Sequence, residues 1–208
     1  MSLESSDQAA RPGERRTPRV LDDPVVLRAF AHPLRLDLHM LLIREGVTTA
    51  ADVARTLNIS QALASHHLRQ LAKYGFAEQV EGRDHRERPW RALSISTTWQ
   101  GADRTESGAG AADLLEQTLA ERSLGALAEW QQRRREPEQE EWREITGISH
   151  SLLYLTPDET ADLVEALDEV VRPLLDRSLR GRDARPEGAR PVELTTLVVP
   201  LTPTDSGA

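Results

Sequence analysis

The chain has 208 residues, no cysteine and a formal net charge of −8 at pH 7, with 38% hydrophobic and 29% charged residues. This composition predicts a folded soluble protein of one large domain or two small ones, and the lack of cysteine excludes disulfides, thiolate nucleophiles and sulfur metal ligands. No run approaches the roughly 20 apolar residues that cross a bilayer, and the N-terminus has no signal-peptide core, so we expect a cytoplasmic location.

Charge is distributed unevenly along the chain. Residues 24–95 carry 10 Lys and Arg against 7 Asp and Glu, a net of +3, together with five of the six histidines. Residues 96–208 carry 12 against 22, a net of −10. A basic stretch within an acidic chain can still contact nucleic acid, because the local distribution matters more than the total. Any DNA contact is therefore expected in the first half.

The N-terminal half reads as a series of short helices. Residues 1–20 are polar and predict a flexible arm. A helix is expected from Pro24, after Asp22 or Asp23, and the His32-Pro33 pair should end it. Leucines at three- and four-residue steps predict a second helix over residues 33–46, which Gly46 ends.

Two more helices and a hairpin are expected next. Thr48 or Thr49 should cap a short third helix over residues 50–57. After a turn at residues 58–60, Ser60 should cap a fourth helix that ends near Tyr74. The pattern then alternates, so residues 76–80 and 90–96 predict two strands of a hairpin around a charged loop.

The second half is expected to be mostly helical, with some strand. Gly and Ser residues over 97–110 indicate a linker, followed by a long helix over 111–135 whose pattern resumes at 138–147. The sequence TPDE, with Thr156 as its first residue, predicts a capping box that opens a helix to about Leu179. Residues 151–155 and 192–201 are expected to be strands that could pair with each other.

The fold class that follows is mainly α with small β. A winged helix-turn-helix domain over 21–96 precedes a mostly helical α+β region over 111–203, which would serve dimerisation or sense a small-molecule or protein effector. Aromatic residues in that region could line a pocket, although aromatics at helical spacing more often belong to a core. Helix-turn-helix units present their second helix to the DNA major groove, here the helix from Ser60.

The fourth helix has two different faces. At 100° per residue, one face collects the core candidates Leu63, Ala64, His67, Leu68 and Leu71. The other carries short polar and basic side chains that suit base edges, and the wing tip carries arginines that suit phosphates. The predicted DNA-binding residues are Ser60, Gln61, Ala62, Ser65, His66, Arg69 and Lys73 in the helix and Arg83, Arg86 and Arg88 in the wing.

Alternative interpretations remain at several positions. The wing tip could be an ordinary solvated turn, and His67 is expected to be a core histidine beside the wing rather than a metal ligand. No nucleophile elbow, phosphate loop or metal-ligand spacing occurs, so neither an enzyme nor a cofactor is expected. A winged helix that docks on another protein, without reading DNA, is the alternative function, and the modest charge of +3 favours it.

The stretch LRAFAHPLRLDLHMLL, the helix SQALASHHLRQL, its closing glycine and the charged hairpin together resemble the ArsR family of bacterial winged-helix transcriptional regulators. The resemblance covers about a third of the chain. It implies a homodimer on an inverted repeat, acting mostly as a repressor, with Gln61, Ser65 and His66 facing bases. The third helix has no cysteine and the late helix has no His/carboxylate cluster, so metal sensing is not expected.

Overall fold

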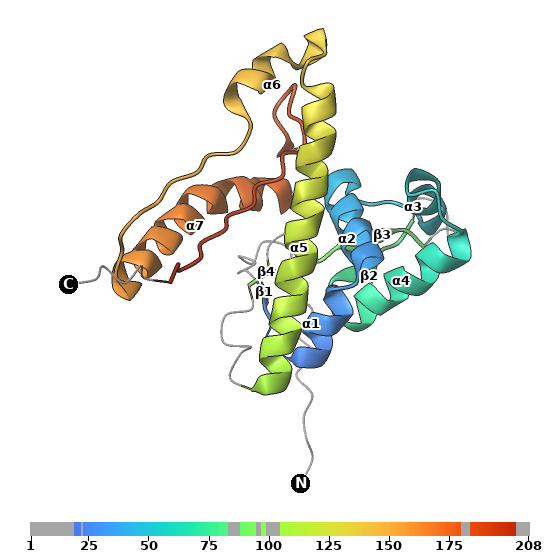
Figure 1. Ribbon diagram of the computed structural model, residues 1–208. Helices are drawn as coiled ribbons and strands as arrows, with labels where there is room; N and C mark the ends of the chain where they lie inside the picture. The colour runs from blue at the N-terminus through green and yellow to red at the C-terminus, as the bar shows by residue number, and fades with distance from the viewer. Residues whose placement is uncertain are drawn as a thin grey trace, which may run out of the picture.

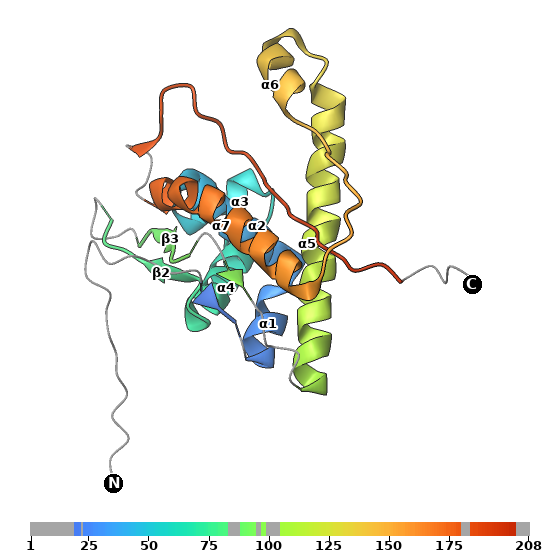
Figure 2. The ribbon, with the colours of Figure 1, turned by 90° about the vertical axis from the view of Figure 1, so that its left-hand side faces the viewer.

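The fold is mainly helical, with two small sheets, and its N-terminal part is a winged helix-turn-helix domain (Figures 1 and 2). It was obtained as a computed structural model that describes residues 19–21, 23–82, 88–94, 97–98, 105–179 and 184–202. The elements, in chain order, are β1 (Arg19–Val20), α1 (Pro24–Phe30), α2 (Pro33–Glu45), α3 (Ala50–Thr56), α4 (Gln61–Lys73), β2 (Ala77–Gln79), β3 (Trp90–Ala92), β4 (Thr97–Thr98), α5 (Glu106–Arg133), the 3₁₀ turn η2 (Pro137–Gln139), α6 (Glu140–Ile145) and α7 (Pro157–Leu179).

Local capping places the first four helices where the sequence predicts them. The carboxylate of Asp23 accepts a hydrogen bond from the Val25 amide at 2.8 Å, and Pro24 occupies the first turn of α1. Thr49 caps α3 and Ser60 caps α4 in the same way, each through its hydroxyl group. The predicted bounds of these four helices are confirmed to within one or two residues.

The predicted hairpin is present as β2 and β3, which pair antiparallel with Gln79 opposite Trp90, although both strands are shorter than predicted and β3 ends at Ala92. A further bridge joins Thr48 to Trp90, with reciprocal backbone hydrogen bonds of 3.0 and 2.7 Å. This bridge ties the segment between α2 and α3 to the base of the wing. The wing is therefore attached to the helix-turn-helix unit through backbone pairing as well as through side-chain packing.

A second pairing lies where the sequence predicted an arm and a linker. Strands β1 and β4 pair in parallel, with Arg19 opposite Thr97 and Val20 opposite Thr98. The last two residues of the expected arm are therefore a strand, while residues 1–18 lie outside the described residues. The pairing was missed because a two-residue strand leaves no measurable alternation in the sequence.

The long helix α5 begins at Glu106, before the expected start at residue 111, so the last five residues of the expected linker are helical. Thr105 caps it by accepting a hydrogen bond from the Gly108 amide at 3.0 Å. Gly108 is buried in the first turn of α5, so this glycine belongs to a packed helix and not to a linker. The guanidinium of Arg28 on α1 also donates to the carbonyl oxygen of Ser107 at 3.0 Å. The start of α5 thus packs with the winged-helix domain.

One hydrophobic core holds these elements together. Phe30 on α1 stacks on Phe76, which precedes β2, with ring centroids 4.0 Å apart and an interplanar angle of 8°. Leu38 on α2 and Leu68 on α4 are fully buried beside them, and Leu115 closes the core from α5. All buried residues lie between Leu21 and Thr118; the described residues after Thr118 include none.

The C-terminal half matches the prediction in its helices and not in its strands. The capping box at α7 is confirmed, because the Thr156 amide donates to the Glu159 carboxylate at 2.8 Å and the Glu159 amide to the Thr156 hydroxyl at 3.2 Å. The expected strands over residues 151–155 and 192–201 are absent: both segments are extended but pair with no described strand. None of the described helices is long and apolar enough to cross a membrane.

Two leucines of α4 provide a matched test of this core. Leu68→Ala removes a fully buried side chain and should lower the free energy of unfolding by about 3–5 kcal/mol, through lost transfer free energy and the cavity left behind. Leu63→Ala, on the same helix but 39% exposed, should cost about 1 kcal/mol or less. Urea denaturation measures both variants, and equal losses would contradict the described orientation of α4.

Candidate nucleic-acid interface

Helix α4 is fixed by its inner face and leaves its outer face open. Ala64, Leu68 and Leu71 are at most 1% exposed, and His67 is 8% exposed, so these four residues anchor the helix as predicted. Ser60 starts the helix by accepting a hydrogen bond from the Leu63 amide at 3.2 Å. This arrangement fixes both the rotation of α4 and the position of its first turn.

The predicted contact residues of α4 lie together on the other face. Ser65 is half-buried, and the remaining members are exposed: Ser60, Gln61, Ala62, His66, Arg69 and Lys73. Figures 1 and 2 place α4 and α7 on opposite sides of the winged-helix domain. The acidic C-terminal half of the same subunit therefore does not cover this face.

The prediction that Leu63 belongs to the core is wrong. It is 39% exposed, although its angular position on the helix lies near the buried face. Leu63 lies in the first turn of α4, and within the described part of the chain no element buries it. Its apolar side chain therefore adds to the open face near Gln61 and Ala62, the type of surface that can contact a thymine methyl group.

The wing is described in part. Of its three predicted arginines, Arg88 is exposed, whereas Arg83 and Arg86 lie outside the described residues. Across the hairpin, the Arg91 guanidinium pairs with the Glu78 carboxylate at 2.5 Å. The cross-strand pair stabilises the base of the wing, but it also neutralises Arg91 as a phosphate contact.

The turn between α3 and α4 sets the angle of the recognition face. Asn58 adopts the left-handed conformation, with φ 52°, in which asparagine is among the few tolerated non-glycine residues. At the other end of α3, the Thr49 hydroxyl donates to Asp52 at 2.7 Å, and this hydrogen bond, with help from Arg55, lowers the pKa of the Asp52 carboxyl group. Arg55 is exposed beside the turn and is a basic residue that the helical pattern of α4 alone could not indicate.

A cluster of imidazoles lies behind the recognition face. The rings of His32 and His67 are 4.9 Å apart and those of His66 and His67 are 5.1 Å apart, with the last pair nearly perpendicular. His67 therefore packs against the start of α2, not beside the wing as expected. Burial, followed by repulsion from His32, His66 and Arg35, lowers the pKa of His67; burial and Arg35 lower that of His32. Among the described residues, no group of His and carboxylate side chains could hold a metal ion.

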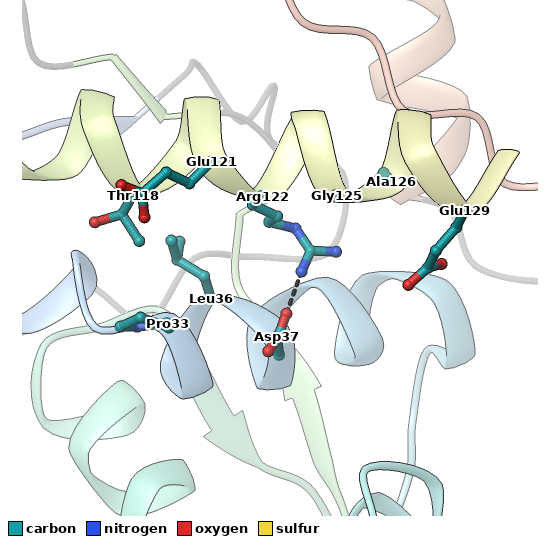
Figure 3. Close-up of a pocket in the computed structure, with 9 residues that line it drawn as sticks. All are labelled: Pro33, Leu36, Asp37, Thr118, Glu121, Arg122, Gly125, Ala126 and Glu129. Carbon is teal, nitrogen blue, oxygen red and sulfur yellow. Dashed lines mark hydrogen bonds and ion pairs between the residues drawn. The ribbon is translucent and has the colours of Figure 1, made fainter. Parts of the chain in front are cut away.

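A hollow of about 300 Å³ lies between α2 and α5 (Figure 3). Arg122 crosses it to form an ion pair with Asp37, and its second nitrogen is 3.9 Å from the Glu193 carboxylate. Two carboxylates already face this one guanidinium, so the hollow has no surplus positive charge to offer an acidic ligand. Tyr154, which could have lined a pocket or belonged to a core, does neither, because it is 95% exposed.

Comparison with known proteins supports the helix-turn-helix assignment. Residues 30–80, from the end of α1 to the first wing strand, match a helix-turn-helix domain family. A search of the curated proteins found no match. Among solved structures, a mutant of Lactococcus lactis ZitR is 19% identical, covering 66% of this chain and 73% of that chain with a TM-score of 0.30. Wild-type apo MarR from E. coli is 15% identical, covering 71% and 87% with a TM-score of 0.29. The assignment of a helix-turn-helix domain rests on the family match and on the geometry of α3 and α4.

The imidazole cluster makes stability depend on pH. Because the pKa values of His32 and His67 are lowered in the folded chain, the unfolded chain binds more protons below the ordinary value of about 6.5. The contribution of these two histidines to the free energy of unfolding should therefore be complete above that pH and should decrease as pH falls toward the lowered pKa values. Denaturation curves across this pH range should show that the free energy of unfolding depends less steeply on pH in His67→Gln than in the wild type. An unchanged slope of free energy against pH would contradict the described burial of His67.

Proposed function

We propose that this chain is a sequence-specific DNA-binding transcriptional regulator. It works as a homodimer that reads an inverted repeat, with α4 of each copy in the major groove and the β2–β3 wing along the adjacent backbone. Its partner is double-stranded DNA, its place is the cytoplasm, and it acts as a repressor by occupying promoter DNA. The resemblance to ArsR regulators and the helix-turn-helix family match over residues 30–80 support this proposal.

The observation that carries the proposal is the open outer face of α4. Gln61 and Ser65 are short, polar and one turn apart, so both can reach the floor of a major groove while the helix backbone stays within it. Arg69 and Lys73 continue the same face toward its C-terminal end, where the groove wall carries phosphates. Along α4, the side chains that would contact bases thus come before those that would contact DNA phosphates.

The distribution of charge supports the same orientation. The net charge of residues 24–95 is +3, whereas residues 96–208 carry −10. Figures 1 and 2 place α7, the most acidic of the late helices, on the side away from α4. Repulsion between the acidic half and DNA would therefore favour approach through α4 and disfavour approach through α7.

The first test is base selectivity. Genomic fragments selected by the purified chain at physiological salt should contain a common inverted repeat. The double variant Gln61→Ala and Ser65→Ala should lose about 1–3 kcal/mol of discrimination against mismatched sites, with little change in unfolding. A competition shift assay measures this loss, and the paired change Gln131→Ala and Gln132→Ala on α5 is the matched control. Wild-type selectivity in the α4 variant would contradict the assignment of α4.

If selection recovers no DNA and the chain instead captures a protein through the same face, the winged helix is an interaction module. In that case the proposal of DNA recognition is wrong, whatever the oligomeric state of the chain. The α4 variant should then weaken capture of that protein, whereas the α5 control should not.

The second test is salt dependence. Lys73→Gln should weaken binding to all sequences about equally and should reduce the slope of log affinity against log salt by about 0.9, because one phosphate contact is lost. Lys73 lies over the Tyr74 ring, with its ammonium 5.2 Å from the centroid, so it is held near the end of α4. Titrations at several salt concentrations measure the slope; a loss confined to one DNA sequence would mean that Lys73 reads a base.

A further inference from the structure

We propose that Leu63, in the first turn of α4, contacts the C5-methyl group of a thymine in the major groove and so makes α4 selective for that base. Ala62 beside it would widen the same apolar contact. The inference rests on the proposed function and deepens it, because it names the chemical group of DNA that the recognition helix would select. It adds an apolar side chain to the polar and charged contacts proposed for α4.

The first argument is the place of Leu63 along the helix. It is the third residue of α4, which begins at Gln61 after the N-cap Ser60. In helix-turn-helix proteins the N-terminal residues of the second helix contact base edges. The Leu63 amide donates to the Ser60 hydroxyl at 3.2 Å, so the cap holds the backbone of the leucine in that first turn. Leu63 therefore lies in the part of α4 that would approach the bases most closely.

The second argument is exposure. Leu63 is 39% exposed, whereas the other two leucines of α4, Leu68 and Leu71, are at most 1% exposed. A single exposed leucine is common on protein surfaces and carries no inference by itself. Here the exposed leucine lies in the same turn as Gln61 and Ala62, at the border of the open face of a helix whose other face is fixed in the core. Position and exposure together therefore present this apolar side chain to the proposed DNA groove.

The third argument is the chemistry of the exposed first turn. Gln61 and Leu63 lie on either side of Ala62, because successive residues of a helix point about 100° apart. Each of the three side chains would therefore meet a different part of the groove floor. The Gln61 amide can bond the N6 and N7 atoms of adenine, and apolar side chains contact the thymine methyl group. An A·T pair displays both groups in the major groove, so the first turn as a whole suits neighbouring A·T pairs.

Other parts of the duplex offer Leu63 no favourable contact. The thymine methyl is the apolar group that base pairs display in the major groove, while their other groups there are hydrogen-bond donors and acceptors. An apolar side chain placed against those polar groups would remove water without replacing its hydrogen bonds, which costs free energy. Phosphates suit the cationic side chains that come later in α4, Arg69 and Lys73. Leu63 would thus favour thymine and also disfavour a G·C pair at the same position.

Uracil substitution tests the methyl contact, because deoxyuridine differs from thymidine by lacking only this methyl group. Each thymine of one half-site in the selected operator is replaced in turn by uracil, and affinity is measured by fluorescence anisotropy. Replacement of the thymine that Leu63 contacts should weaken wild-type binding about fourfold, as expected for one buried methyl group. In Leu63→Ala the same replacement should have little effect, since the partner side chain is gone. Leu63 lies outside the buried core, so this variant should remain folded.

Two variants control for other causes. Leu114→Ala on α5 removes a leucine of similar exposure, 45%, outside α4, and should keep the full uracil effect. Leu63→Met keeps a long apolar side chain at the same position and should keep most of the effect. Any influence of uracil on the shape or stiffness of the duplex would be the same with or without Leu63. Comparison of the variants therefore isolates the contact between the leucine and the methyl group.

The outcomes separate this inference from the proposed function. A uracil effect at one thymine that disappears in Leu63→Ala and remains in both controls supports the contact. A wild-type chain that binds its operator equally well with thymine and with uracil at every position, or an operator without thymine in its half-sites, overturns the contact and leaves DNA recognition intact. A uracil effect that persists at full size in Leu63→Ala also overturns it, because the effect then belongs to the DNA. A chain that selects no DNA overturns both.

Discussion

The proposed recognition surface of this protein depends on the burial of the opposite face of α4. Ala64, Leu68 and Leu71 are in the core against α2 and α3, and this packing decides which residues of the helix face outward. The stack of Phe30 on Phe76 ties the same core to the start of the wing. Because a helix of 13 residues has little stability by itself, its exposed polar row is ordered only through this apolar contact. The exposed polar row that we propose reads DNA and the buried apolar row thus lie on two faces of one helix.

Most of the winged-helix domain could be predicted from the sequence, because its signals are local. Proline at Pro24 and Pro33, capping residues such as Thr49 and Ser60, and a change of period at Gly75 each act within a few residues. The exposed row of α4 followed from its angular pattern for the same reason. Leu63 was misplaced because the angular pattern of α4 does not show which neighbouring elements reach its first turn.

The failures concern contacts between distant residues. The pairing of β1 with β4 joins segments almost 80 residues apart in the chain, through two residues each. The sequence of neither segment indicates that it pairs with the other. Gly108 was taken as part of a linker because composition cannot separate a glycine in a loop from one that is buried in a helix. The partner of the His67 ring, His32, also lies on another element. The strand prediction for residues 192–201 recognised a strand-like composition but not the absence of a partner within the subunit.

The two halves of the chain are linked by a contact at the end of α2 in addition to the packing of α5. The guanidinium of Arg185 donates to the carbonyl oxygens of Arg44 and Ile43, at 2.8 and 3.3 Å, and so satisfies acceptors that the C-terminal turn of α2 leaves open. Any event that displaces the chain around Arg185 must break these bonds, and α2 packs directly on α4. Arg185 therefore ties the C-terminal half to the helix on which α4 packs.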